Sequence, residues 1–181
     1  MNPTLQDYAE ELLMTQFIDP TSDRLFRHMA WANAQLFAVL RTLPDAVLTY
    51  CEPGNSWSLA ATLHHLVEAA AFYAQRLDGQ PAPVVAADPP ATMHDLVALA
   101  AACAAADARL YGAAHTPHGV VVRQDNPALT RARTTVLAQA IHHATEHRAQ
   151  IAGALVANGV TALSLDDLDV WAFGDAEGLG A

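Results

Sequence analysis

Two histidines in the second half of the chain have the spacing of metal ligands on a helix. His143 and His147 lie four residues apart, and residues with this spacing share one helix face, one turn above the other. Two such imidazoles can bind one ion, as they do in the H-E-x-x-H metalloproteases. Ala144 stands where that motif carries its glutamate, so the pattern does not favour a protease.

A third histidine, His65, lies on an apolar stripe of another segment with helical periodicity. The stripes contain Leu59, Thr62, His65, Ala69 and Phe72 in one segment, and Val136, Ala140, His143, His147, Ile151 and Ala154 in the other. Buried imidazoles need a hydrogen-bond partner or a metal. Three inward imidazoles can hold one divalent ion and leave a position for water or substrate. We therefore predict a metal site formed by His65, His143 and His147.

The other histidines are not predicted to be ligands of this site. His64 and His142 lie about 100° around their helices from His65 and His143, so we expect them to face a neighbouring helix or solvent. His115 and His118 lie in a predicted loop and are expected to be solvated. His28 and His94 have no partner at the spacing of metal ligands.

The acidic residues do not indicate a carboxylate di-iron site, because the chain has no Glu-x-x-His sequence. Glu68 and Glu146 lie close to the predicted ligands in sequence. Either they orient an imidazole N–H or they are solvated charges. Arg148 is expected to pair with an acid. Cys51 and Cys103 lack zinc-site spacing and are expected to be buried or half-buried free thiols.

Long apolar-periodic segments predict the elements that must position these residues. We expect helices over about 22–43, 58–77, 93–111 and 134–157, with short helices at 4–16 and near 166–173. Ser56 or Ser58 is expected to cap the second of these helices, Thr92 the third, and Asn158-Gly159 to end the fourth. Residues 120–122 are expected to be extended or part of a small hairpin. Four helices of this length predict an all-α four-helix bundle.

Composition narrows the classes of protein that the chain can belong to. It has 181 residues, of which 52% are apolar and 15% charged, with a formal net charge of −10. This size predicts one domain over 1–181, with a core over about 22–158 and a C-terminal helix near 165–173. The negative charge does not favour nucleic acid or anionic membranes as partners. We find no signal or membrane-span pattern and expect a cytoplasmic protein.

Several short motifs, in order along the chain, resemble the DinB/YfiT-like family of metalloenzymes. They are Trp31-Ala32-Asn33, Trp57-Ser58 followed by His65-Leu66, His143-x-x-x-His147-Arg148-x-Gln150, and the tail Asp167-Leu168-Asp169-Val170-Trp171. Ala149 departs from the family pattern, which has glycine after the arginine. Alanine is also small, so close helix packing is expected to survive.

The resemblance implies an up-down-down-up bundle, a homodimer, and zinc or nickel bound by His65, His143 and His147. It also implies a low-molecular-weight thiol such as mycothiol, bacillithiol or glutathione as a cosubstrate. We therefore expect a metal-dependent thiol S-transferase that acts on a small electrophile. The alternatives are a hydrolase that uses activated water and a non-catalytic, metal-stabilised binding or stress-response module.

Overall fold

The structure, a computed structural model, describes residues 18–179. Its long helices are α2 (Pro20–Leu40), α3 (Leu59–Asp78), α4 (Leu96–Ala114) and α5 (Arg133–Ala157). The shorter elements are η1 (Asp45–Thr49), β1 (Val120–Val122), β2 (Thr130–Ala132), η2 (Asp166–Leu168) and α6 (Val170–Ala176). The helix expected over 4–16 lies outside the described residues.

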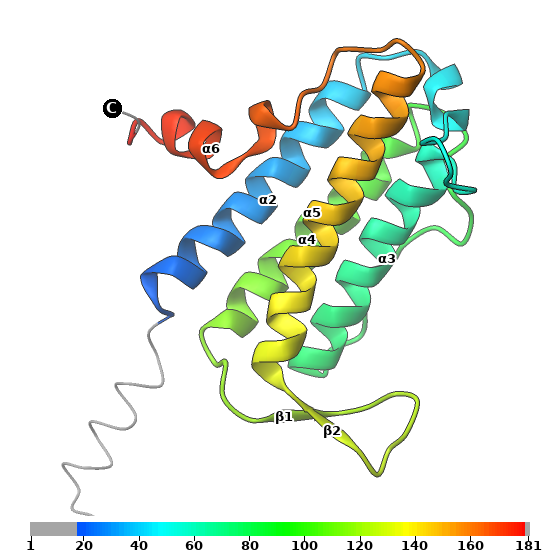
Figure 1. The fold of residues 1–181 in the computed structure, drawn as a ribbon. Helices are drawn as coiled ribbons and strands as arrows, with labels where there is room; N and C mark the ends of the chain where they lie inside the picture. The colour runs from blue at the N-terminus through cyan, green and yellow to red at the C-terminus, as the bar shows by residue number, and fades with distance from the viewer. Residues whose placement is uncertain (1–17, 180–181) are drawn as a thin grey trace, which may run out of the picture.

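The four long helices form one bundle. In Figure 1, α2 and α5 run in one direction, and α3 and α4 run in the other. Helices α2 and α3 each pack against both α4 and α5. The order of directions is therefore up-down-down-up, and the predicted all-α four-helix bundle is confirmed. In this arrangement α3 and α5, which carry the three predicted ligands, are antiparallel neighbours.

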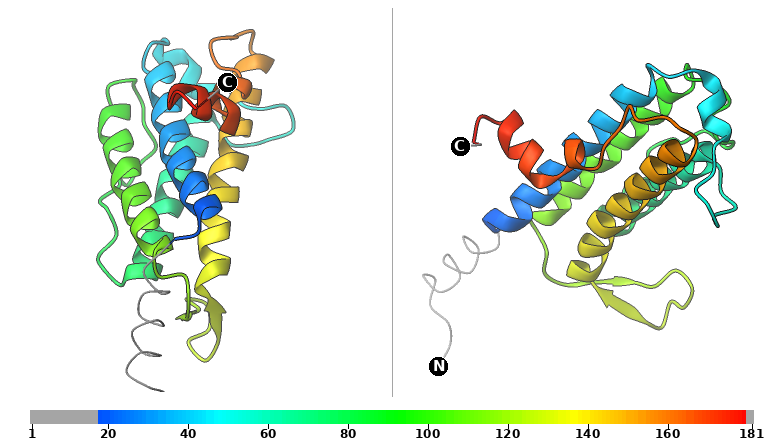
Figure 2. Two further views of the ribbon diagram at one scale, coloured as in Figure 1. Left: turned by 90° about the vertical axis from the view of Figure 1, so that its left-hand side faces the viewer. Right: turned by 45° about the horizontal axis from the view of Figure 1, so that its top comes forward.

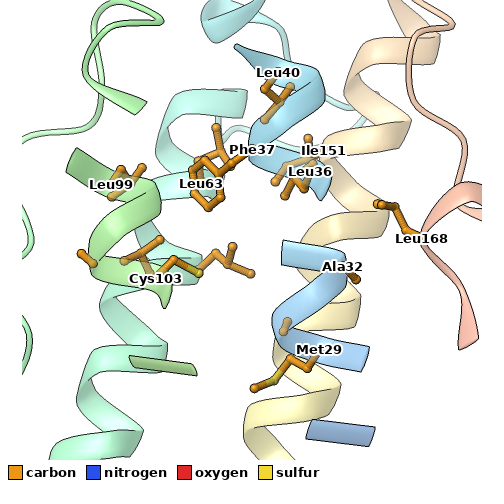
Figure 3. Close-up of a cluster of buried hydrophobic side chains, with 14 of the residues drawn as sticks. Met29, Ala32, Leu36, Phe37, Leu40, Leu63, Leu99, Cys103, Ile151 and Leu168 are labelled. Carbon is orange, nitrogen blue, oxygen red and sulfur yellow. The ribbon is translucent and has the colours of Figure 1, made fainter. Parts of the chain in front are cut away.

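Side chains from all four helices fill the centre of the bundle. Figure 3 shows Leu36 of α2, Leu63 of α3 and Ile151 of α5 meeting there, and none of the three has accessible surface. Leu99 of α4 also packs into this cluster. The aliphatic core fixes the spacing and rotation of the helices, and thereby the direction of every side chain that they carry.

The ends of α3 and α5 follow from local sequence. The Ser58 hydroxyl accepts a hydrogen bond from the Ala61 N–H at 3.2 Å and caps α3. Helix α3 ends at Gly79, whose φ of 72° is left-handed and suits glycine. Helix α5 ends at Asn158, and Gly159 follows with a φ of 79°. Of the two predicted serine caps, Ser58 is the one used, and the predicted stop at Asn158-Gly159 is confirmed.

The predicted cap at Thr92 is wrong. Helix α4 begins three residues later than expected, at Leu96, directly after Asp95. The Asp95 carboxylate accepts hydrogen bonds from the N–H groups of Ala91 and Thr92 at 3.0 and 2.9 Å. These bonds stabilise a turn that precedes the helix. The Asp95 carboxylate therefore accepts hydrogen bonds from this turn and not from the first N–H groups of α4.

The hairpin and the C-terminal segment lie at the periphery of the bundle. Strands β1 and β2 are antiparallel, with Val121 opposite Arg131, and the hairpin stands next to the first residue of α5 (Figure 1). The helix expected near 166–173 consists of two pieces, η2 and α6. Figure 2 shows α6 beside α2, where Leu168 and Phe173 are buried.

Helix α4 is the one described helix that is long and apolar enough to cross a membrane. Its buried residues include Leu99, Cys103 and Leu110, and it packs against α2 and α3. A core helix passes the same test of length and composition, and the packing of α4 identifies it as a core helix of the bundle.

Candidate metal centre

The side chains of His65, His143 and His147 meet between α3 and α5. The Nε2 atom of His143 lies 3.2 Å from that of His65 and 3.1 Å from that of His147. One nitrogen from each ring lies within 4.8 Å of the other two. Ligand nitrogens about 2.0–2.1 Å from a tetrahedral ion stand about 3.3 Å apart. Two of the three nitrogen pairs in these rings, hereafter the histidine cluster, therefore have the separation that a shared divalent ion requires.

Burial differs within the histidine cluster. His147 is buried, whereas His65 and His143 are half-buried. The cluster is therefore partly accessible from the surface at His65 and His143. Within the described part of the chain, no carboxylate or thiol joins the three imidazoles in this cluster. Such a site could hold an ion with positions open to an incoming molecule.

Gln150 fixes the tautomer of His147. The Nδ1 atom of His147 lies 2.6 Å from Oε1 of Gln150. A carbonyl oxygen only accepts, so Nδ1–H donates and the Nε2 lone pair is left free to face the cluster. Such a contact orients a ligand and raises its basicity. The sequence contained this signal, because Gln150 lies one turn after His147, but the residue type does not identify the pairing.

Substitution of Gln150 by leucine is expected to lower the metal affinity by about 10- to 100-fold, since the acceptor that orients His147 is lost. Gln150→Glu, which keeps an acceptor oxygen, is the matched control and is expected to retain the affinity. Competition with a chelating dye would measure both variants. Equal losses in the two variants would show that Gln150 acts only through packing.

Aromatic side chains flank the histidine cluster on two sides. The Trp57 ring meets His65 edge-on at a centroid distance of 4.8 Å and is stacked near His147 at 6.4 Å. Tyr73 meets His143 edge-on at 5.7 Å. Trp57 directly precedes the cap of α3, and this position places its ring against His65. These contacts limit the orientations open to the imidazoles.

Burial favours the neutral form of two rings. It lowers the pKa of His143 to about 4, and the nearby charges of protonated His147 and His65 act in the same direction. Burial also lowers the pKa of His65, again with His147 contributing. A metal binds the neutral imidazole. Near pH 7 these two rings are therefore ready to act as ligands without first losing a proton.

The metal-free protein is expected to lose stability as the pH falls from 6.5 toward 4. The pKa of His143 is lowered in the folded state, so the unfolded chain binds more protons in this window and is stabilised relative to the folded protein. The full shift corresponds to roughly 3 kcal/mol, and solvent screening reduces the expected loss to about 2 kcal/mol. Urea unfolding at pH 7 and pH 4.5 would measure it. His143→Gln should show a smaller difference between the two pH values, and an unchanged difference would contradict this account.

Behind the histidine cluster lies a buried polar network. Arg148 donates to Asn33 Oδ1 at 2.8 Å and to the Thr145 hydroxyl at 3.0 Å. Asn33 in turn donates to Asp107 at 3.0 Å, and the Cys103 thiol lies 3.7 Å from the same carboxylate oxygen. The expected acid partner of Arg148 is therefore reached through Asn33 and not by direct contact.

The charged groups of this network, Asp107 and Arg148, are buried. Burial raises the pKa of Asp107 to about 6, against the lowering effect of its hydrogen bond from Asn33. Burial lowers the pKa of Arg148 to about 10, against the stabilising charge of Asp107. The charged form of Asp107 is stabilised by Arg148, and that of Arg148 by Asp107, because an unpaired buried charge destabilises the folded state. The network joins α2, α4 and α5 one residue away from His147.

The acids expected beside the site do not orient its ligands. Glu68 Oε2 lies 3.1 Å from Nδ1 of His64, and the Nε2–H of His64 donates to the Ala86 carbonyl at 2.7 Å. Glu146 is exposed. Glu146 is therefore a solvated charge on the helix surface, which was one of the two alternatives. Glu68 pairs with His64. Neither is within the histidine cluster.

The remaining histidines and the cysteines are placed largely as expected. His142, His118 and His94 are exposed. His115 is half-buried, with its Nδ1 3.0 Å from the Tyr111 carbonyl, so the expectation of a solvated ring is wrong for this residue. His28 is buried against the Leu168 carbonyl at 2.7 Å. Both cysteines are free, and Cys103 is buried as expected. Cys51 is exposed, so the expectation of a buried or half-buried thiol is wrong for this residue.

A pocket of about 570 Å³ lies between α3, α5 and the β-hairpin. We call it the hairpin pocket. It is lined by Phe72, Tyr73, Arg76, Val121, Val122, Arg123, Gln124, Asp125, Arg131, Thr135, Val136 and Gln139. Tyr73, which contacts His143, is part of its wall, and Gln139 precedes His143 by one helical turn. The hairpin pocket therefore reaches the immediate neighbourhood of the histidine cluster and has the size of a small-molecule site.

Comparison with known proteins gives one family. A family model described as the DinB family matches residues 14–173, which include the whole histidine cluster and most of the chain. No curated protein matches the chain.

Proposed function

Because the chain belongs to the DinB family, we propose that it is a divalent-metal-dependent enzyme whose ion is bound by His65, His143 and His147. The observation that carries this proposal is the approach of three Nε2 atoms to 3.1 and 3.2 Å across two helices. In the described residues these nitrogens contact only one another, and a shared ion would give each of them a partner. The orientation of His147 by Gln150 also supports the assignment.

We propose zinc or nickel as the ion. Imidazole suits zinc, copper, iron and nickel, and three histidines with an open position are typical of catalytic zinc. Structural zinc is usually enclosed by four protein ligands, whereas the cluster formed by residues 18–179 has three members. This difference favours an enzyme over a metal-stabilised module. A cytoplasmic location and a homodimer stay predictions.

For the reaction, we propose the transfer of a small thiol to an electrophile. When bound, the ion would supply positive charge and open coordination positions, which lower the pKa of a thiol or of water. A hydrolase of the H-E-x-x-H type also needs a carboxylate base, and here Glu68 pairs with His64 while Glu146 is exposed. A thiol, with an unperturbed pKa of about 8.5, needs much less help than water to lose its proton.

The residues around the histidine cluster would then bind and orient the reactants. Phe72, Tyr73 and Val136 give the hairpin pocket an apolar wall close to His143. Trp57 covers His65 and His147 and limits the access of water there. A reactant held against these rings would be presented to the cluster in a limited set of orientations, which is a large part of catalysis.

The test is to load the purified protein with zinc or nickel and to supply glutathione, cysteine or mycothiol with a panel of small electrophiles. We expect metal-dependent loss of thiol and a thioether product of matching mass, both absent from His143→Ala. Hydrolysis of an ester or amide panel without thiol, together with no thioether, would establish the hydrolase instead. Metal binding with neither activity would establish the binding module.

A further inference from the structure

The hairpin pocket concentrates positive charge in an acidic protein. Three of its lining residues are arginines, Arg76, Arg123 and Arg131, and one is an acid, Asp125. The formal charge of the lining is therefore +2, whereas the whole chain carries −10 and has only nine basic residues. A third of the basic side chains thus line one pocket. Such a local field attracts anions even when the net charge repels them.

The three arginines differ in how much of their charge is compensated. Arg123 pairs with Asp125, with an Nε–Oδ1 distance of 2.9 Å. Arg76 donates to the backbone carbonyl of Val122, which is a neutral acceptor. Among residues 18–179, neither Arg76 nor Arg131 forms an ion pair. Two positive charges therefore remain for a ligand.

Apolar walls accompany this charge. Val121 lies directly opposite Arg131 in the hairpin, so both side chains project from the same face of the ribbon. Phe72, Tyr73 and Val136 stand on the helices that complete the hairpin pocket. An apolar enclosure with a few fixed polar groups is typical of a small-molecule site, and guanidinium groups suit carboxylates and sulfonates.

We propose that the hairpin pocket binds an organic anion, namely a molecule with an apolar or aromatic body and a carboxylate or sulfonate group. Its apolar body would lie against Phe72, Tyr73 and Val136, and its acidic group would meet Arg131 and Arg76. If the proposed function holds, this molecule is one of the two reactants, and a neutral analogue is a poor substrate. The binding itself requires no metal.

The test uses two fluorescent probes on the metal-free protein. One is the anion 8-anilinonaphthalene-1-sulfonate, and the other is its neutral analogue N-phenyl-1-naphthylamine. Arg131→Gln is expected to weaken binding of the anion about tenfold, because a charge-assisted hydrogen bond is lost. Asp125→Asn is expected to strengthen it about threefold, because Arg123 is released from its partner. The neutral probe should change less than twofold in either variant.

Two variants with opposite expected signs keep the test independent of folding defects. Arg131 and Asp125 are both exposed, and Arg41→Gln on the exposed end of α2 serves as a charge-matched control with no expected effect. If Arg131→Gln and Asp125→Asn leave the affinity for the anion unchanged, or if both probes change in parallel, the proposal is wrong. Because no metal or thiol is present, this result does not depend on whether the protein is a transferase.

Discussion

Replacement of His147 by alanine is expected to lower the affinity for zinc or nickel at least about a hundredfold. His147 is the buried member of the histidine cluster, and Gln150 fixes its tautomer. Zinc binding by four-ligand sites is worth about 10–16 kcal/mol, which is about 2.5–4 kcal/mol for each ligand. Two remaining imidazoles would hold the ion weakly. Metal analysis after gel filtration, with chelator competition, measures the loss.

His142→Ala is the matched control for this prediction. His142 lies on the same helix, within one turn of His143, but is exposed. Its removal is expected to leave the metal content and affinity within twofold of the unsubstituted protein. His115→Ala should behave in the same way. A full equivalent of tightly bound metal in His147→Ala, or a comparable loss in His142→Ala, would show that the ion lies elsewhere.

Replacement of Arg148 by methionine is expected to lower the free energy of unfolding by about 3 kcal/mol at pH 7. Methionine keeps much of the side-chain volume, so the change mainly removes the charge and its hydrogen bonds to Asn33 and Thr145. The ionised Asp107 would then be buried without a compensating cation. Breaking a buried charge pair typically costs 3–5 kcal/mol, and the lower end is expected because Asp107 can take up a proton.

Two further measurements separate this charge effect from a packing defect. The pKa of Asp107 is raised to about 6, so the carboxyl is largely neutral at pH 5 and the loss in Arg148→Met should be smaller there. The double variant with Asp107→Leu should recover part of the stability, because it removes the second charge. Arg41→Met is the exposed control. Equal destabilisation at pH 5 and pH 7 would indicate that packing dominates.

The meeting of the three histidines could be predicted from the sequence because it depends on helical periodicity. His143 and His147 share a face through their spacing alone, and the apolar stripe of the other helix places His65 on its inner side. The same reasoning left the role of Glu68 open. This residue lies three positions after His65 but four after His64, and it pairs with His64. The periodicity allowed both pairings, and only the packing of the helices distinguishes them.

Features that join distant segments could not be predicted from the sequence. Arg148 and Asn33 are 115 positions apart, and Asn33 and Asp107 are 74 apart. Nothing in their local sequence identifies them as partners. The valine run at 120–122 was correctly expected to be extended. This run forms a wall of the hairpin pocket only because the packing of the whole bundle brings the hairpin close to the histidine cluster. The same packing gathers the three arginines in that pocket.

The hairpin consists of only two three-residue strands and a turn, and its residues are largely exposed. Exposed loops tolerate insertions and replacements that a packed helix does not. The imidazoles are anchored in the helices, whereas much of the pocket wall belongs to this tolerant segment. Changes in the hairpin could therefore alter the wall of the pocket and leave the histidine cluster intact. If the pocket binds a reactant as proposed, related chains with hairpins of other lengths are expected to accept other molecules.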